Sequence, residues 1–112
     1  TYSLDATKTA TFVAAKIKPS LQGVEISLRT DFGDGNVNNL DIVSPLLGRF
    51  NVANLLAAMA AAVALEISLE RIAPVVPQLQ GAVGRMQRVP SNDGCFIVDY
   101  AHTPDALSQV LA

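Results

Sequence analysis

The sequence predicts an α/β protein in which an antiparallel sheet is followed by buried helices and then by a strand–helix unit. Up to about residue 45, apolar and polar residues alternate, which is the period of half-buried strands. From about residue 51 they give way to long runs of Ala and Leu, which favour helices. A short apolar strand and a new helix start follow between residues 95 and 111.

The composition argues for a folded protein and against two classes of partner. Half of the 112 residues are hydrophobic and 16% are charged, which argues against disorder. The net charge is −2 and no Lys/Arg cluster is present, so we expect no nucleic-acid partner. The longest uninterrupted apolar run, Leu55–Leu65, is far shorter than the roughly 20 residues of a membrane span, so we expect no membrane partner.

The single cysteine and the chain ends bear on the cellular compartment of the protein and on its full length. Cys95 permits no intramolecular disulfide and no cysteine zinc site, which favours the reducing cytoplasm, and we expect it to be buried on a strand. The start, Thr1–Ser3, shows no signal-peptide pattern. Because the chain lacks an initiating Met and stops within a helical pattern, we expect it to be part of a longer protein.

Strands are predicted in the first 45 residues. One covers Thr11–Ile17 and ends at Lys18-Pro19-Ser20. Strict alternation over Gly23–Arg29 predicts one buried and one wet face, as in antiparallel sheets. Turn-forming residues at 32–36 predict a hairpin to a returning strand, Leu40–Val43. We therefore expect a three-stranded antiparallel unit.

Two helices are predicted next. Asn51 can cap a helix that runs to about Glu66 and is apolar nearly all round, so we expect it to be buried. A second helix is capped by Ser68, and its apolar stripe reaches Leu79 despite prolines near its start and end. Glycines near residue 84 then predict a hinge and a domain boundary, which divides the chain into residues 1–84 and 85–112.

The most informative stretch follows the strand Cys95–Val98. Asp99 and His102 come just after its carboxyl end, and Thr103-Pro104 is a favourable helix start. Ligands of open α/β sheets bind at the carboxyl ends of strands, and helix N-termini favour anions. Asp99 and His102 are therefore candidate ligand contacts.

The candidate residues each leave two interpretations open. Asn51 and Asn54 are either the cap and third residue of a helix, or amides that match the edge of a purine. Arg85 is either a surface charge at the hinge or a bidentate phosphate contact. Asp99 either bonds within its own loop or accepts hydrogen bonds from ribose hydroxyls.

Other chemistries find little support in the sequence. Asp99 and His102 have no third potential metal ligand clustered nearby, so we predict no metal site. No serine lies in a nucleophile elbow, and no Cys–His spacing indicates a catalytic dyad. Gly33-Asp34-Gly35 does not match a phosphate-binding loop.

Three motifs resemble the Mur ligase family. Asp99–Leu107 (DYAHTPDAL) resembles the start of the C-terminal domain in the branch that adds the third amino acid. Pro45–Leu55 (PLLGRFNVANL) resembles the G-x-F-N-V-x-N segment of the central domain, and Gly84–Val89 (GRMQRV) resembles the G-R-M-E-R-V junction. The resemblance implies part of a Mur ligase central ATPase domain, with antiparallel strands and buried helices, followed by the first strand and helix of a Rossmann-like C-terminal domain.

The family resemblance implies an ATP-dependent amide ligase of peptidoglycan synthesis. In such a ligase, ATP phosphorylates the D-Glu carboxylate of UDP-MurNAc-L-Ala-D-Glu, and the amine of a diamino acid attacks the acyl phosphate. Mg2+ would accompany ATP, with ligands mostly outside this chain. Because the UDP-binding domain, the phosphate loop and the motif that selects the amino acid would also lie outside it, we expect the chain alone to be inactive.

The resemblance also assigns roles to the candidate residues. Asn51 and Asn54 would lie near the adenine and phosphates of ATP, and Arg85 would reach the phosphates. Asp99 would bind the ribose hydroxyls, and His102 would line the nucleotide site. Since these residues come from two domains, ATP would help to draw the domains together across the hinge.

The sequence departs from the family motifs at two places, and two alternative functions stay open. Gln87 replaces the usual Glu of the junction motif, and Thr30–Gly33 replaces T-P-x-G. A folylpolyglutamate or cyanophycin synthetase is the alternative enzyme, and a non-catalytic nucleotide-binding or interaction module is the alternative of another class. We expect the isolated chain to self-associate, because a sheet that should cover the Leu55–Leu65 helix is largely absent.

Overall fold

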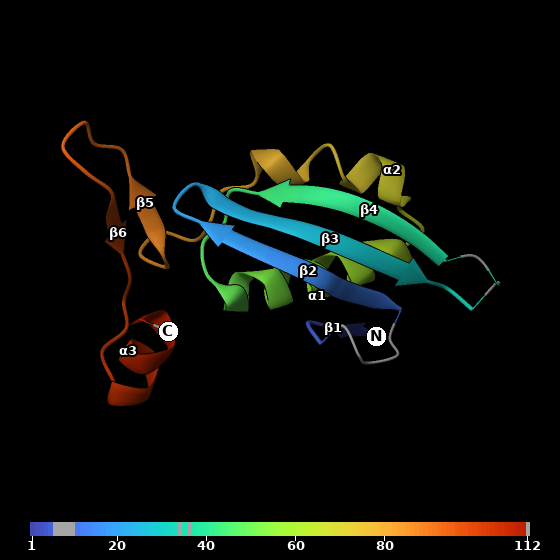
Figure 1. Cartoon of the computed structure of the whole chain (residues 1–112), viewed down its shortest axis with the longest axis horizontal. Helices are drawn as coiled ribbons and strands as arrows, with labels where there is room; N and C mark the ends of the chain where they lie inside the picture. The colour runs from blue at the N-terminus through green and yellow to red at the C-terminus, as the bar shows by residue number, and fades with distance from the viewer. Residues whose placement is uncertain (6–10, 34, 36, 112) are drawn as a thin grey trace. The chain divides into compact units, whose positions relative to one another are not determined.

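A computed structural model describes residues 1–5, 11–33, 35 and 37–111, and its chain forms two compact units (Figure 1). The first unit is Thr1–Leu79 and the second is Gln80–Ala112. Within the described residues, the first unit holds a four-stranded sheet and the second a two-stranded sheet. The α/β prediction is confirmed, whereas the predicted domain boundary near Gly84 stays a prediction.

The sheet of the first unit has the strand order β1-β2-β3-β4. Its strands are β1 Tyr2–Ser3, β2 Phe12–Ser20, β3 Gly23–Asp31 and β4 Val37–Ser44. The predicted antiparallel unit is confirmed, because β3 pairs antiparallel with both β2 and β4. The short β1, which lies parallel to β2, was not predicted because two residues carry no period.

Strand β2 is longer than predicted. Residues 18–20 were expected to end it, but Pro19 pairs with Val24 inside the ladder. The β1 strand pairs only with Phe12 and Val13, so β2 is an edge strand at Pro19. Proline is tolerated there because an edge position does not require its missing N–H.

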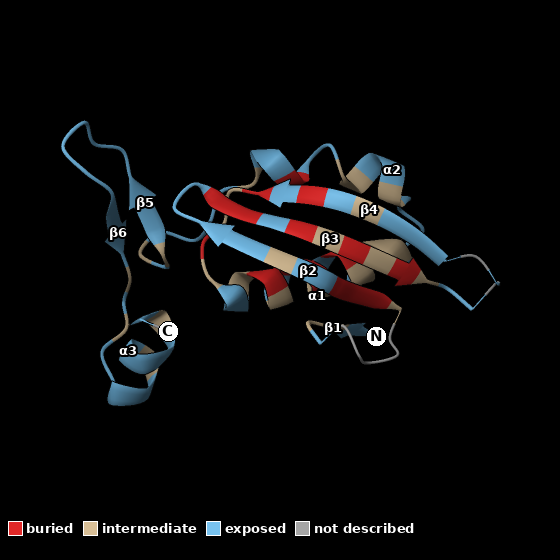
Figure 2. Ribbon diagram, viewed as in Figure 1, coloured by how far each residue is buried: buried red, intermediate tan, exposed pale blue. Residues whose placement is uncertain are grey.

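One face of β3 forms the centre of the core. Val24, Ile26 and Leu28 are buried on this face, while the residues between them are more exposed (Figure 2). Helix α1, Arg49–Ala64, packs its larger side chains into the same core. These are Val52, Leu55, Leu56 and Met59.

Two predictions about the helices are wrong. Helix α1 is not buried all round, because its larger side chains occupy one stripe and leave alanines such as Ala61 exposed. The predicted second helix divides into α2, Leu69–Ile72, and a 3-10 turn η1, Val76–Gln78. The break lies at Pro74, which has no N–H to continue the helical hydrogen bonds.

The second unit contains a hairpin and a helix. Strands β5, Gln87–Val89, and β6, Phe96–Val98, pair antiparallel, and α3 covers Pro104–Leu111. The predicted cap is confirmed, since the Thr103 hydroxyl accepts the Ala106 N–H at 3.2 Å. The expected burial of Cys95 is wrong: it is exposed, as are all residues of both strands, because no other element among the described residues of this unit covers the hairpin (Figure 2).

None of the helices in the described part of the chain combines the length and apolar character that a membrane span needs. Large apolar side chains such as Leu107 and Leu111 are nevertheless exposed in this chain. Self-association of the isolated chain stays a prediction.

The start of β3 gives a sharp test of the sheet. Gly23 has φ +143°, and a Cβ added there would lie 2.1 Å from the carbonyl oxygen of Ser44. We expect Gly23→Ala to lower the free energy of unfolding by about 3 kcal/mol or more, measured by urea denaturation. The control Gly33→Ala, at φ +77° with open space around it, should cost only about 1 kcal/mol. Equal losses for both variants would contradict the close approach of β3 to the end of β4.

Candidate functional site

Asn51 and Asn54 lie inside helix α1, so the interpretation of Asn51 as its cap and Asn54 as its third residue is wrong for both residues. Gly48 is the N-cap, with φ 89°, and Asn51 is the third helical residue. The Asn51 Nδ2 donates to the Leu47 carbonyl oxygen at 2.6 Å, which ties the helix to the preceding loop. One amide hydrogen and the amide oxygen of Asn51 can still contact a ligand. Asn54, almost one turn further, is exposed.

The N-terminus of α1 suits an anion. Gly48 offers no capping side chain, and the first turn carries no acidic residue. The first N–H groups of a helix lack intrahelical partners, and the helix dipole makes this end positive. A phosphate at the very start of α1 would therefore meet favourable donors, although the Asn51 N–H already donates to the Gly48 carbonyl oxygen at 3.1 Å.

The Asp99 carboxylate joins the two ends of the β5–β6 hairpin. Its Oδ2 accepts the Met86 N–H at 2.8 Å, and its Oδ1 accepts the Ala101 N–H at 2.8 Å. Both hydrogen bonds have an ionised acceptor, which makes them stronger than neutral ones. The interpretation of Asp99 as a loop contact is thus correct, and each oxygen retains a lone pair for a further donor. Its contact with ribose stays a prediction.

Arg85 and His102 both contact Tyr100. The Arg85 Cζ lies 5.7 Å from the centre of the Tyr100 ring, and the Tyr100 and His102 rings lie 5.0 Å apart at 53°. The His102 Nδ1 is 3.0 Å from the Tyr100 carbonyl oxygen. Because a carbonyl can only accept, this contact favours the tautomer with hydrogen on Nδ1, which leaves Nε2 of the neutral ring as an acceptor.

The structure therefore brings together Arg85, Asp99 and His102 within the second unit. Asn51 and Asn54 belong to the first unit. Sequence reasoning missed Tyr100, although an aromatic residue between two candidate site residues was a possible signal. It also missed the role of Gln87, whose Oε1 accepts the Gly84 N–H at 2.9 Å.

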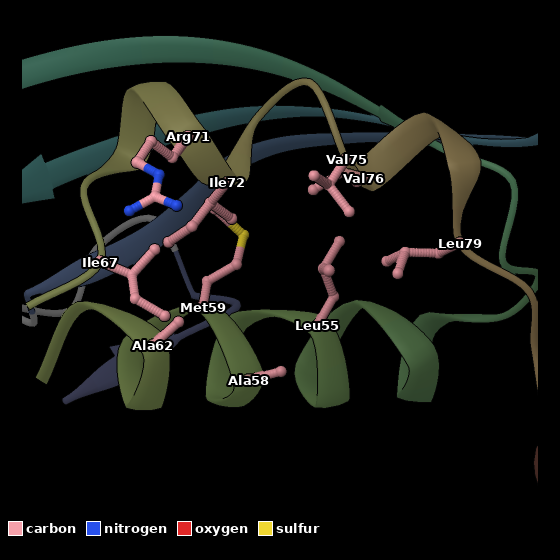
Figure 3. A pocket seen from close by; sticks show the side chains of 10 residues that line it. All are labelled: Leu55, Ala58, Met59, Ala62, Ile67, Arg71, Ile72, Val75, Val76 and Leu79. Carbon is pink, nitrogen blue, oxygen red and sulfur yellow. The ribbon is translucent and has the colours of Figure 1, made fainter. Parts of the chain in front are cut away.

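A pocket of about 350 Å³ lies elsewhere, between α1 and the segment of α2 and η1 (Figure 3). Apart from Arg71, its walls are apolar, with Met59 and Leu55 on one side and Ile72 and Val76 on the other. It contains none of the predicted site residues. A pocket with so few polar groups is poorly suited to hold a triphosphate.

Metal ligands do not gather in the described residues. No three His, Cys, Asp or Glu side chains lie close enough there to hold an ion. The donors and acceptors that the structure does offer, which are amides, a guanidinium, a carboxylate and an imidazole, suit the hydroxyls and phosphates of a nucleotide.

Comparison with known proteins identifies the family. Residues 1–62 match the model of the Mur ligase middle domain. The UDP-N-acetylmuramoyl-L-alanyl-D-glutamate–2,6-diaminopimelate ligase of Pseudomonas aeruginosa is 52% identical over 90 residues, which cover 80% of this chain and 18% of that protein. The ligase of the same name from Pseudomonas putida is 46% identical over 111 residues, 98% of this chain and 21% of that protein.

A solved structure with this ligase name superposes with a TM-score of 0.76 at 45% identity, and covers 98% of this chain and 21% of the other. The chain belongs to the Mur ligase family. It spans about a fifth of the length of these relatives.

Loss of one Asp99 oxygen tests the hairpin contact. Asp99→Asn replaces an accepting oxygen with an NH2 group, which would face a backbone N–H. We expect amide hydrogen exchange around residues 86 and 101 to accelerate about tenfold, because one hydrogen bond is lost. Asp93→Asn, which removes the same charge from an exposed turn, should leave this exchange unchanged. Unaltered exchange in Asp99→Asn would show that the carboxylate does not hold the hairpin.

Proposed function

We propose that this chain is part of a longer, cytoplasmic ligase that uses ATP to join 2,6-diaminopimelate to UDP-MurNAc-L-Ala-D-Glu in peptidoglycan synthesis. The similarity to the Pseudomonas putida ligase carries this proposal, because it extends over 111 residues and so includes all five candidate residues. The choice of diaminopimelate rests on the names of these relatives.

We propose that the first unit contacts the adenine and the phosphates of ATP. The amides of Asn51 and Asn54 offer both donors and acceptors to a base, and they lie less than one turn apart on α1. The uncapped start of the same helix supports a phosphate contact.

In the second unit, the proposed roles follow the chemistry of each group. The Arg85 guanidinium is exposed and can donate two parallel hydrogen bonds to a phosphate. The half-buried Asp99 carboxylate would accept from ribose hydroxyls with its remaining lone pairs. His102 is exposed and would line the nucleotide site with its Nε2 side.

The proposed reaction has two steps. A substrate carboxylate oxygen bonds to the γ-phosphorus while ADP leaves, and the amine nitrogen then attacks the acyl carbon while phosphate leaves. The residues of this chain would bind and orient the nucleotide, which is the main contribution that proteins make to phosphoryl transfer. Mg2+ would neutralise phosphate charge, with ligands in other parts of the protein.

Phosphate release from ATP tests the reaction. The full-length protein should release phosphate only when UDP-MurNAc-L-Ala-D-Glu and an amino acid are both present, and faster with diaminopimelate than with lysine. Reactions without the amino acid, and with a folate and glutamate in place of the natural substrates, are the controls. Release with the folate pair alone would favour the alternative ligase, and no release with any pair would contradict the proposal.

Arg85→Gln tests the phosphate contact. The variant loses the charge-assisted hydrogen bonds, so we expect the Kd for ATP to rise about 10- to 100-fold, measured by calorimetry on the full-length protein. Arg88→Gln removes the same charge from β5 and should change this Kd less than twofold. An Arg85→Gln protein that binds ATP like wild type would remove Arg85 from the site.

A further inference from the structure

We propose that Tyr100 is a positioning residue that holds the Arg85 guanidinium ready for the phosphates of ATP. This inference rests on the proposed function, because it gives Arg85 the phosphate contact. It assigns to Tyr100 no contact with ATP of its own. The juxtaposition of the Arg85 guanidinium and the Tyr100 ring carries it.

The contact itself suits this role. The Arg85 Cζ lies over the Tyr100 ring at 5.7 Å from its centre, within the range of a cation–π interaction. In the part of the chain that the structure describes, no carboxylate forms an ion pair with this guanidinium. A ring attracts the cation without occupying its N–H donors, whereas a carboxylate would occupy the same donors that bind phosphate.

The backbone on both sides of the contact is fixed by side chains. Asp99 accepts from the N–H of Met86, next to Arg85, and from that of Ala101, next to Tyr100. Gln87 accepts from the N–H of Gly84 on the other side of Arg85. These bonds place the two side chains beside each other, so the remaining freedom of Arg85 lies in its own side chain.

His102 limits the freedom of Tyr100. The centre of its ring lies 5.0 Å from the centre of the Tyr100 ring, and its Nδ1 is hydrogen-bonded to the Tyr100 carbonyl oxygen. Tyr100 is 66% exposed, so the fold of the unit does not depend on its burial. An exposed aromatic ring in contact with both a guanidinium and an imidazole is therefore better explained by positioning than by core packing.

Two substitutions test whether the aromatic ring of Tyr100 is the group that matters. Tyr100→Leu removes the π face, and Tyr100→Phe keeps it. Because cation–π contacts at exposed sites are modest, we expect Tyr100→Leu to raise the Kd for ATP about two- to fivefold in the full-length protein. Tyr100→Phe should bind ATP like wild type. Tyr2→Leu, which removes the other tyrosine of this chain, is the matched control and should have no effect.

A double-mutant cycle asks whether Tyr100 acts through Arg85. In an Arg85→Gln background, Tyr100→Leu should raise the Kd no further, because the group that it positions is gone. An equal rise in both backgrounds would overturn the proposal, as would a Tyr100→Phe protein as weak as Tyr100→Leu.

Measurement of binding separates this inference from the ligase activity. Coupling between Tyr100 and Arg85 in ATP affinity, in a protein without ligase turnover, would support the positioning role and overturn the proposed reaction. Full ligase turnover, with independent effects of the two substitutions on the Kd for ATP, would support the proposed reaction and overturn the positioning role of Tyr100.

Discussion

The burial of one face of β3 is the constraint on which the first unit depends. Val24, Ile26 and Leu28 are each at most 2% exposed, and burial of such a side chain contributes roughly 1.5–3 kcal/mol. A register shift of one residue would turn all three toward water, so the pairing with β2 and β4 is strongly specified. The same core holds α1 against the sheet, and this fixes the helix that carries Asn51 and Asn54.

The second unit is held by a different kind of interaction. Its strands are short and exposed, so hydrophobic burial contributes little within this unit. Instead of hydrophobic burial, hydrogen bonds between side chains and backbone N–H groups hold this unit together. The side chains that accept them are Asp99, Gln87 and Thr103. Polar groups therefore set the geometry around Arg85, and a change in one of them is expected to alter the position of the guanidinium more than the stability of the whole protein.

Local patterns explain which features could be predicted from the sequence. The alternation in β3 and the Thr103 cap of α3 depend on neighbouring residues, and both were predicted correctly. The exposure of Cys95 depends on which layers cover a strand, which no local pattern contains. The cap of α1 was misplaced because Gly48, with its positive φ, starts the helix before Asn51. The contact between Arg85 and Tyr100 joins residues 15 positions apart and needed the structure.

The central claim is that residues of this chain contact ATP in a Mur ligase. The most direct measurement is a crystal structure of the full-length protein with a non-hydrolysable ATP analogue and Mg2+. We expect Arg85 to donate to a phosphate, Asp99 to accept from the ribose, and the amide of Asn51 or Asn54 to lie at the base or phosphates. An analogue bound without contact to any of these residues or to His102 would contradict the claim.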